Sequence, residues 1–237
     1  KWLPYFDGAR RGHDTSGFVP LSTYGRFSRG IATGANEFFA LTRADVQTHG
    51  LEDEFLSPCI TKSAQIANTT FTDGDWQRLI DAGAAAYVLD IRSEPSDAVR
   101  RYLELGESKG YHQRYLTRTR SPWYKLERRN PFPILLNVFS RGGYKVVRNY
   151  SGALAFTCYH GFAPNIFGTE VLDHLFLFLT SEMGRKHIMR NSRRYGDGLD
   201  KFEPNDLNEV LVPTSDSRSG STRTFTRSIV PTARRTR

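Results

Sequence analysis

The chain has 237 residues, of which 38% are hydrophobic and 13% aromatic, and its formal net charge at pH 7 is +8. This composition excludes a chain that is disordered throughout, and the length predicts one domain or two small ones. Two cysteines exclude a disulfide-rich scaffold, and no run reaches the roughly 20 apolar residues of a membrane helix, so we expect a cytoplasmic protein with no membrane partner.

In the first half of the chain, short strands are predicted at 24–31 and 37–41, with glycines between them. Thr42 is a good N-cap for a helix that runs to about His49, and Gly50 is a typical helix stop. A second short helix is predicted at 75–82, and a strand follows at 86–91. Pro95 then opens a helix whose apolar residues roughly follow helical spacing.

In the second half, strands are predicted at 123–126, 134–139, 144–148 and 154–158. Gly142-Gly143 is typical of a hairpin turn between two of these strands, and Gly161 is expected to form a turn after the last of them. Helices are predicted from Thr169 and over 181–190, and a short helix or turn precedes 210–212. The fold class is therefore α+β, with a β-rich, antiparallel-leaning central sheet, short helices and a helical C-terminal portion.

The positive charge is concentrated in two segments. Residues 100–149 contain 12 Lys and Arg but only 3 Asp and Glu. Residues 214–237 contain 6 Lys and Arg and 1 Asp or Glu. The last segment is rich in Ser, Thr and Arg and is predicted to be a basic, disordered tail. The internal segment alternates basic and aromatic side chains, which is typical of surfaces that bind phosphates and stack on bases. The alternative is an ordinary solvated sheet face with extended arginines.

Motifs for catalysis are not evident. The sequence has no phosphate-binding P-loop, no dinucleotide-binding glycine fingerprint and no Gly-x-Ser-x-Gly turn, so no catalytic or metal-binding residues are predicted. Asp97, Glu107 and Lys109 resemble the acidic and lysine residues of metal-dependent nucleases, which leaves a small metal-dependent restriction endonuclease as an alternative function. A non-catalytic module that binds a protein partner is a further alternative.

Four segments carry a family resemblance. They are 29–39 (RGIATGANEFF); Gly106-Glu107, Gly110-Tyr111, Arg114-Tyr115 and the run TRTRSPWY at 117–124; Pro133-Ile134-Leu135 with Asn149, Phe162 and Pro164; and 201–213, which begins KFEPNDL. In this order and spacing they resemble the C-terminal target-recognition domain of adenine-specific DNA methyltransferases of bacterial restriction–modification systems. The resemblance covers roughly residues 20–213.

The resemblance implies a division of the chain and a set of partners. It implies a linker at 1–22 from a missing N-terminal catalytic domain, a DNA target-recognition domain at 23–213, and the tail at 214–237. We expect double-stranded DNA and the N-terminal methyltransferase domain, in cis or in trans, as partners, and a nucleoid-associated location. S-adenosylmethionine would bind the missing domain and no cofactor would bind this chain, which would not be catalytic alone.

The same resemblance and the charge pattern together nominate DNA-binding residues. Guanidinium, amide and hydroxyl groups read base edges and contact phosphates. Trp123 and Tyr124 have a second interpretation as core residues, and the glycines of 29–39 are expected to form a turn. The candidates are Arg29, Thr33, Asn36, Arg114, Arg118, Arg120, Trp123, Tyr124, Arg141, Lys145 and Arg148.

Overall fold

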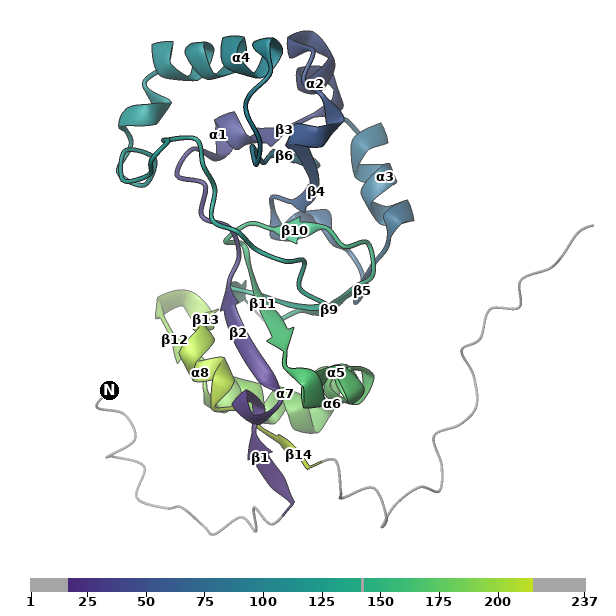
Figure 1. Cartoon of the computed structure of the whole chain (residues 1–237). Helices are drawn as coiled ribbons and strands as arrows, with labels where there is room; N and C mark the ends of the chain where they lie inside the picture. Colours follow the sequence, from purple (N-terminus) through teal and green to yellow (C-terminus); the bar gives the residue numbers. More distant parts are fainter. Residues whose placement is uncertain (1–16, 142, 215–237) are drawn as a thin grey trace, which may run out of the picture.

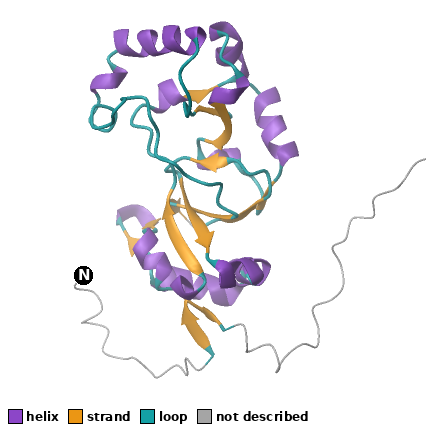
Figure 2. Ribbon diagram, viewed as in Figure 1, coloured by secondary structure: helices purple, strands orange, loops and turns teal. Residues whose placement is uncertain are grey.

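The computed structural model describes residues 17–141 and 143–214, and its helices and strands gather into two halves along the molecule (Figure 1). The upper half in that view holds α1 to α4 with β3, β4, β6 and β10, whereas the lower half holds β1, β2, β11 and β14 with α5 to α8. Both halves mix helices and strands (Figure 2), which confirms the α+β class. No helix of the described residues is both long enough and apolar enough to cross a membrane.

A five-stranded sheet forms the centre of the fold. Three of its four strand pairings are antiparallel and that of β9 with β5 is parallel, which confirms the antiparallel-leaning prediction. Its strands, in spatial order, are β2 (Gly25–Arg29), β11 (Tyr159–Pro164), β7 (Ile134–Asn137), β9 (Val146–Asn149) and β5 (Thr70–Phe71).

Strand β11 occupies an interior position of this sheet, so the prediction of a turn at Gly161 is wrong. A Cβ atom on Gly161 would lie 2.0 Å from the ring of Phe132. The glycine is therefore required by the aromatic ring that lies against the sheet, and no local change of chain direction is involved. Tyr159 and Phe162 of the same strand are fully buried and belong to the core.

His160 is a buried titratable residue of β11, with 2% of its surface exposed. Its Nε2 donates to the carbonyl of Phe202 at 2.8 Å, and burial lowers the pKa of its imidazole from the ordinary 6.5. The unfolded chain therefore binds a proton at a higher pH than the folded chain does. The stability that this neutral histidine contributes is present above pH 6.5 and is lost as the pH falls below that value.

We expect the free energy of unfolding to fall on acidification from pH 6.5, by up to about 1.4 kcal/mol per pH unit from this group. His160→Gln keeps an N–H donor for the Phe202 carbonyl but does not titrate. Urea titrations between pH 5 and 7.5 should therefore show a weaker pH dependence for the variant. Equal pH dependence of the two proteins would contradict this assignment.

The four-stranded sheet lies in the upper half, among four helices. Its strands, in order, are β10 (Leu154–Ala155), β4 (Leu56–Ile60), β6 (Tyr87–Leu89) and β3 (Ala40–Leu41). The helices are α1 (Asn36–Phe39), α2 (Arg43–His49), α3 (Asp73–Asp81) and α4 (Asp97–Ser108). The strand predicted at 37–41 is thus wrong over most of its length, because Phe38 and Phe39 are both buried on one short helix.

The predicted start and end of the helix between Thr42 and Gly50 are confirmed. Thr42 accepts a hydrogen bond from the Asp45 backbone N–H at 3.1 Å, and Asp45 accepts one from the Thr42 N–H at 2.8 Å. This reciprocal pair is a capping box at the start of α2. Gly50 ends the helix with a φ of 62°, in the left-handed region that glycine adopts without strain.

The two sheets meet where β2 ends. The Gly30 N–H donates to the Tyr159 carbonyl at 3.1 Å, and the Ile31 N–H donates to the Ala155 carbonyl at 2.8 Å. Ile31 also forms a parallel bridge with Phe156. The chain of β2 therefore passes directly from the five-stranded sheet into the upper half.

The C-terminal portion contains the predicted helices, but strands separate them. Its helices are α5 (Ile166–Glu170), α6 (Leu172–Thr180), α7 (Glu182–Arg190) and α8 (Pro204–Asn208), and its strands are β12 (Arg193–Arg194), β13 (Leu199–Lys201) and β14 (Leu211–Pro213). A purely helical C-terminal portion is therefore too simple a description. Further 3-10 turns lie at Leu21–Thr23, Asp53–Phe55, Ser63–Gln65, Tyr111–Gln113 and Gly196–Gly198.

Three further features of the structure differ from the sequence predictions. The connection from β7 to β9 contains β8 (Phe139–Arg141), which pairs with β13, so Gly142-Gly143 does not close a simple hairpin; Gly142 itself lies outside the described residues. The strand predicted at 123–126 is absent from the structure. Strand β1 (Phe18–Pro20) pairs with β14, so residues 18–22 of the predicted linker are packed against the fold. The rest of the predicted linker, up to residue 16, and the predicted tail at 215–237 lie outside the described residues.

Candidate nucleic-acid interface

The segment between α4 and the central sheet carries much of the positive charge. We call residues 111–130 the basic loop and residues 29–39 the signature segment. The basic loop contains six Lys and Arg residues and one acidic residue, Glu127. Apart from the 3-10 turn at Tyr111–Gln113 it has no regular secondary structure, so contacts with other segments must hold its shape.

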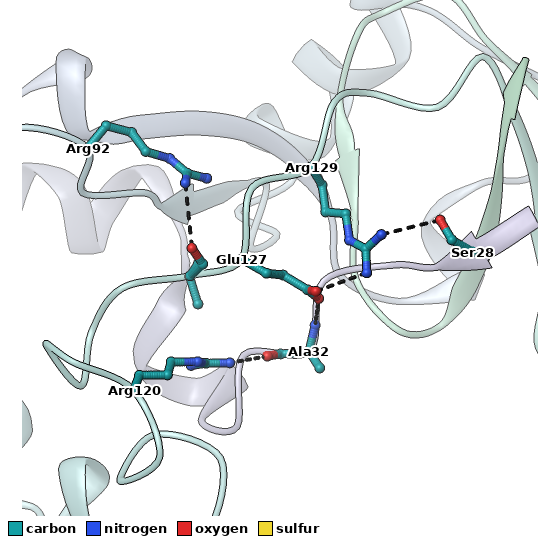
Figure 3. Close-up of polar contacts among 7 residues, drawn as sticks. Ser28, Ala32, Arg92, Arg120, Glu127 and Arg129 are labelled. Carbon is teal, nitrogen blue, oxygen red and sulfur yellow. Dashed lines mark hydrogen bonds and ion pairs between the residues drawn. The ribbon is translucent and has the colours of Figure 1, made fainter. Parts of the chain in front are cut away.

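Arg120 fastens the basic loop to the signature segment. Its half-buried guanidinium donates to the carbonyl of Thr33 at 2.7 Å. It also donates to the carbonyl of Ala32, as Figure 3 shows. Burial lowers the pKa of this guanidinium, and the nearby Glu127 carboxylate opposes that effect. The charge of Arg120 is therefore used to satisfy backbone carbonyls within the protein.

Glu127 and Arg129 add a second set of contacts. Glu127 Oε1 accepts from the Ala32 N–H at 3.3 Å, and its other carboxylate oxygen pairs with Arg129 at 2.9 Å (Figure 3). Arg129 also reaches the Ser28 hydroxyl at 3.4 Å. The single acidic side chain of the basic loop is thus used in joining it to the end of β2.

Arg114 joins the same two segments from the other end of the loop. Its guanidinium pairs with Glu37 at 2.6 Å and lies 4.7 Å from the centre of the Tyr111 ring. Its hydrogen bond holds the pKa of the Glu37 carboxyl below the usual value. Both partners are largely exposed, so this ion pair contributes little to stability but fixes the direction of the side chains.

Trp123 and Tyr124 are held against the core of the upper half. The indole N–H of Trp123 donates to Glu107 at 2.9 Å, and its ring lies 5.2 Å from that of Phe38. The Tyr124 ring lies 6.0 Å from Trp123, and both side chains are half-buried against this core. Of the two interpretations of these residues, this packing supports the core.

The polar residues of the signature segment divide by exposure. Thr33 is buried, and its hydroxyl bonds the Asn36 side chain and accepts from the Ala35 N–H at 3.1 Å. Asn36 is exposed at the start of α1, and Arg29 is exposed at the end of β2. The segment therefore presents Arg29 and Asn36 outward and uses Thr33 to shape its turn.

Three cations of the basic loop have side chains with neither an ion pair nor a hydrogen bond among the described residues. Arg118, Lys125 and Arg128 are all exposed, and none makes an ion pair within the described residues. Their charge is therefore available to a ligand, unlike that of Arg120 and Arg129. Of these three, only Arg118 is among the candidates predicted from the sequence, which carries no signal for whether a cation is exposed or internally bonded.

A groove lies beside the junction of the signature segment and the basic loop. Its volume is about 560 Å³, and it lies between the end of β2, Arg129, β12 and the start of α8. Three guanidinium groups and one carboxylate line it, together with hydroxyl and amide groups. The lining residues are Phe27, Ser28, Arg29, Arg129, Arg193, Glu203, Pro204 and Asn205.

The second predicted basic cluster is largely committed to internal contacts. The Lys145 ammonium donates to the Ile66 carbonyl, and Arg148 donates to the Pro133 carbonyl at 3.0 Å while pairing with Asp173 at 3.2 Å. Arg141 is exposed on β8, opposite Leu199. Of these three candidates, only Arg141 has a side chain with neither an ion pair nor a hydrogen bond in the described part of the chain.

The nuclease alternative does not fit this geometry. Asp97 begins α4 and Glu107 lies near its end, so ten residues, or about 15 Å of helix, separate them. Glu107 is also bonded to Trp123. Among residues 17–141 and 143–214, no group of three or more His, Cys, Asp or Glu side chains is placed to hold a metal ion. Asp97 and Glu107 therefore do not form one metal site.

Comparisons with known proteins agree on one family. Residues 9–233 match the family model described as type II methyltransferase M.Eco57I, C-terminal domain. Type II methyltransferase M.AccI of Acinetobacter calcoaceticus is 34% identical over 214 residues, which are 90% of this chain and 39% of that protein. Type II methyltransferase M.XamI of Xanthomonas campestris pv. amaranthicola is 24% identical over 202 residues, which are 84% of this chain and 37% of that protein.

A solved structure shows a similar fold. The type IIG restriction endonuclease BpuSI aligns with 88% of this chain and 25% of its own, with a TM-score of 0.55 and 10% sequence identity. At that identity the similarity concerns the fold alone. The chain spans about two fifths of the length of the two curated relatives that it matches.

Proposed function

We propose that this chain, which belongs to the family of C-terminal domains of type II methyltransferases related to M.Eco57I, is the part that recognises the DNA sequence for an adenine-specific methyltransferase. The observation that carries the proposal is the basic loop, in which Arg118, Lys125 and Arg128 are exposed and lack acidic partners. Cations held on a fixed loop attract the phosphates of duplex DNA and release its counterions.

Sequence readout requires groups that reach base edges, in addition to the phosphate contacts. Arginine and asparagine pair in a bidentate manner with guanine and adenine in the major groove. Arg29 and Asn36 are exposed on the signature segment, to which Arg120 and Glu127 fasten the basic loop. Phosphate contacts by the loop would therefore position these two side chains on the bases.

Methyl transfer itself belongs, in this proposal, to the part of the relatives that this chain does not span. The chain matches a family model described as a C-terminal domain, and it spans about two fifths of the length of the two curated relatives. We therefore assign the cofactor and the catalytic residues to the N-terminal part.

We expect the triple variant Arg118→Ala, Lys125→Ala, Arg128→Ala to bind duplex DNA at least about tenfold more weakly at low salt. The loss of three phosphate contacts should make the slope of log K against log salt less negative by about 2.7. Fluorescence anisotropy with a labelled duplex, measured over a series of salt concentrations, gives both quantities for the full chain.

A matched control removes the same charge elsewhere. Arg43, Lys62 and Arg190 are exposed, and none makes an ion pair in the described part of the chain. Their triple alanine variant should keep nearly the original salt slope. If the two triple variants behave alike, net charge explains the binding and the basic loop is not the DNA-binding surface; if the unaltered chain does not bind duplex DNA, the proposed function is wrong.

A further inference from the structure

The tip of the basic loop exposes two large apolar side chains. Tyr115 is 72% exposed and Leu116 is 38% exposed. The other aromatic residues of the loop are at least half-buried, because Tyr111, Trp123 and Tyr124 pack against the upper core. Tyr115 and Leu116 therefore differ from their neighbours, and their exposure is a feature to be explained.

Hydrogen bonds hold the backbone of the tip, so this exposure is built into the loop. Thr117 is fully buried, and its hydroxyl donates to the carbonyls of Tyr111 and Arg114. The Arg118 N–H donates to the Arg114 carbonyl at 2.9 Å, and the Thr119 hydroxyl donates to the Leu116 carbonyl at 2.8 Å. The backbone on both sides of Tyr115 is thus fixed by short-range hydrogen bonds.

The signature segment supports the tip from below. Gly34 has a φ of +80°, and a Cβ atom there would lie 2.8 Å from the Leu116 Cβ. The close approach of Leu116 to this glycine seats the tip on the turn that Thr33 and Asn36 shape. The Tyr115 ring is therefore presented outward by a platform that the signature segment and the basic loop build together.

The charge beside the ring identifies the partner. The Arg118 guanidinium lies 5.6 Å from the centre of the Tyr115 ring and has no acidic partner in the described residues. An exposed aromatic ring beside a free guanidinium matches a base beside its phosphate, because the ring stacks on the base and the cation contacts the backbone. An apolar side chain next to such a ring also acts as a wedge in proteins that unstack bases.

We propose that Tyr115, supported by Leu116, stacks on the bases of bound DNA at a step where the duplex is opened. This inference rests on the proposed DNA recognition and deepens it, because it gives the loop a contact with the base stack in addition to its contacts with phosphates. An enzyme that acts on a base must take that base out of the stack, and a ring at this position stabilises the gap that remains.

The test measures binding and base unstacking in the same titration. The probe is a short duplex that carries 2-aminopurine opposite an abasic nucleotide, with the fully paired duplex for comparison. Tyr115→Ala should weaken binding to the abasic duplex about tenfold, or about 1.4 kcal/mol, which is in the range for one base–aromatic stack. It should also remove the protein-induced change in 2-aminopurine fluorescence.

Three results separate this contact from a phosphate contact or a structural role. The salt slope of Tyr115→Ala should equal that of the original chain, because no cation is lost. Tyr115→Phe should retain both affinity and the fluorescence change, because it keeps the ring. Tyr150→Ala is the matched control, because Tyr150 is 59% exposed and has Arg148 4.9 Å over its ring, but lies outside the loop.

The outcomes distinguish this inference from the proposed function. If the unaltered chain binds duplex DNA with a steep salt dependence but Tyr115→Ala binds and perturbs 2-aminopurine equally well, the stacking role is refuted and DNA recognition stands. Equal losses from Tyr115→Ala and Tyr150→Ala would also refute a role specific to the tip. Absence of DNA binding by the unaltered chain would overturn both.

Discussion

Gly30→Ala should destabilise the protein by about 3 kcal/mol, the upper end of the usual cost of inserting a methyl group into a packed interior. A Cβ atom at position 30 would lie 2.2 Å from the Phe156 carbonyl oxygen and 2.5 Å from that of Ala155. The three nearest atoms all belong to the backbone, so no side-chain rotation moves them away. The free energy of unfolding in urea measures the effect.

Gly74→Ala serves as the control and should have the opposite sign. Gly74 lies in the first turn of α3, and its Cβ would meet only ordinary contacts at 3.7 Å. Alanine is the better helix former, so the variant should gain about 0.5 kcal/mol or more. A Gly30→Ala protein as stable as the original would show that the β2 junction is looser than its hydrogen bonds indicate.

Arg120→Ala should lower the free energy of unfolding by about 2 kcal/mol, because hydrogen bonds to charged groups contribute about 1.5–3 kcal/mol. The substitution leaves the carbonyls of Ala32 and Thr33 without their guanidinium donor. It also releases the basic loop from the signature segment. Duplex binding should therefore weaken along with stability, and should be measured at a temperature where the variant is folded.

Arg120→Lys tests whether the forked guanidinium is required. A lysine ammonium is a point charge and does not reproduce the two parallel donations, so we expect only partial recovery of stability. Arg100→Ala is the control for loss of an arginine, because Arg100 is exposed and, within the described residues, pairs only with the exposed Glu94. It should change stability by less than about 1 kcal/mol. Full recovery by lysine would assign the effect to charge alone.

Features that depend on neighbouring residues could be predicted from the sequence. The α2 helix begins and ends as expected, because Thr42, Asp45 and Gly50 satisfy its terminal groups locally. Strand β11 could not be predicted in the same way. Its Gly161 and Pro164 are typical of turns, and the reason for the glycine is a ring at Phe132, 29 positions earlier in the chain.

In the candidate site, too, features set by the local sequence could be predicted and contacts with remote residues could not. The concentration of positive charge in 100–149 is visible in the sequence, and the structure keeps part of it exposed. The sequence could not predict which of these cations lack an internal partner. Arg120, Lys145 and Arg148 all donate to backbone carbonyls, and the carbonyls that Arg120 and Lys145 contact belong to remote segments. Every residue offers a carbonyl, so composition gives no signal for such contacts.

The pairing of β1 with β14 has a consequence for how this unit is connected. Phe18 lies opposite Pro213, and the Thr214 N–H donates to the Gly17 carbonyl at 2.8 Å, so the described chain enters and leaves at one point (Figure 1). A body attached through a single two-stranded stem can be exchanged between longer proteins by cutting at adjacent positions. Such a unit is then replaceable as a whole.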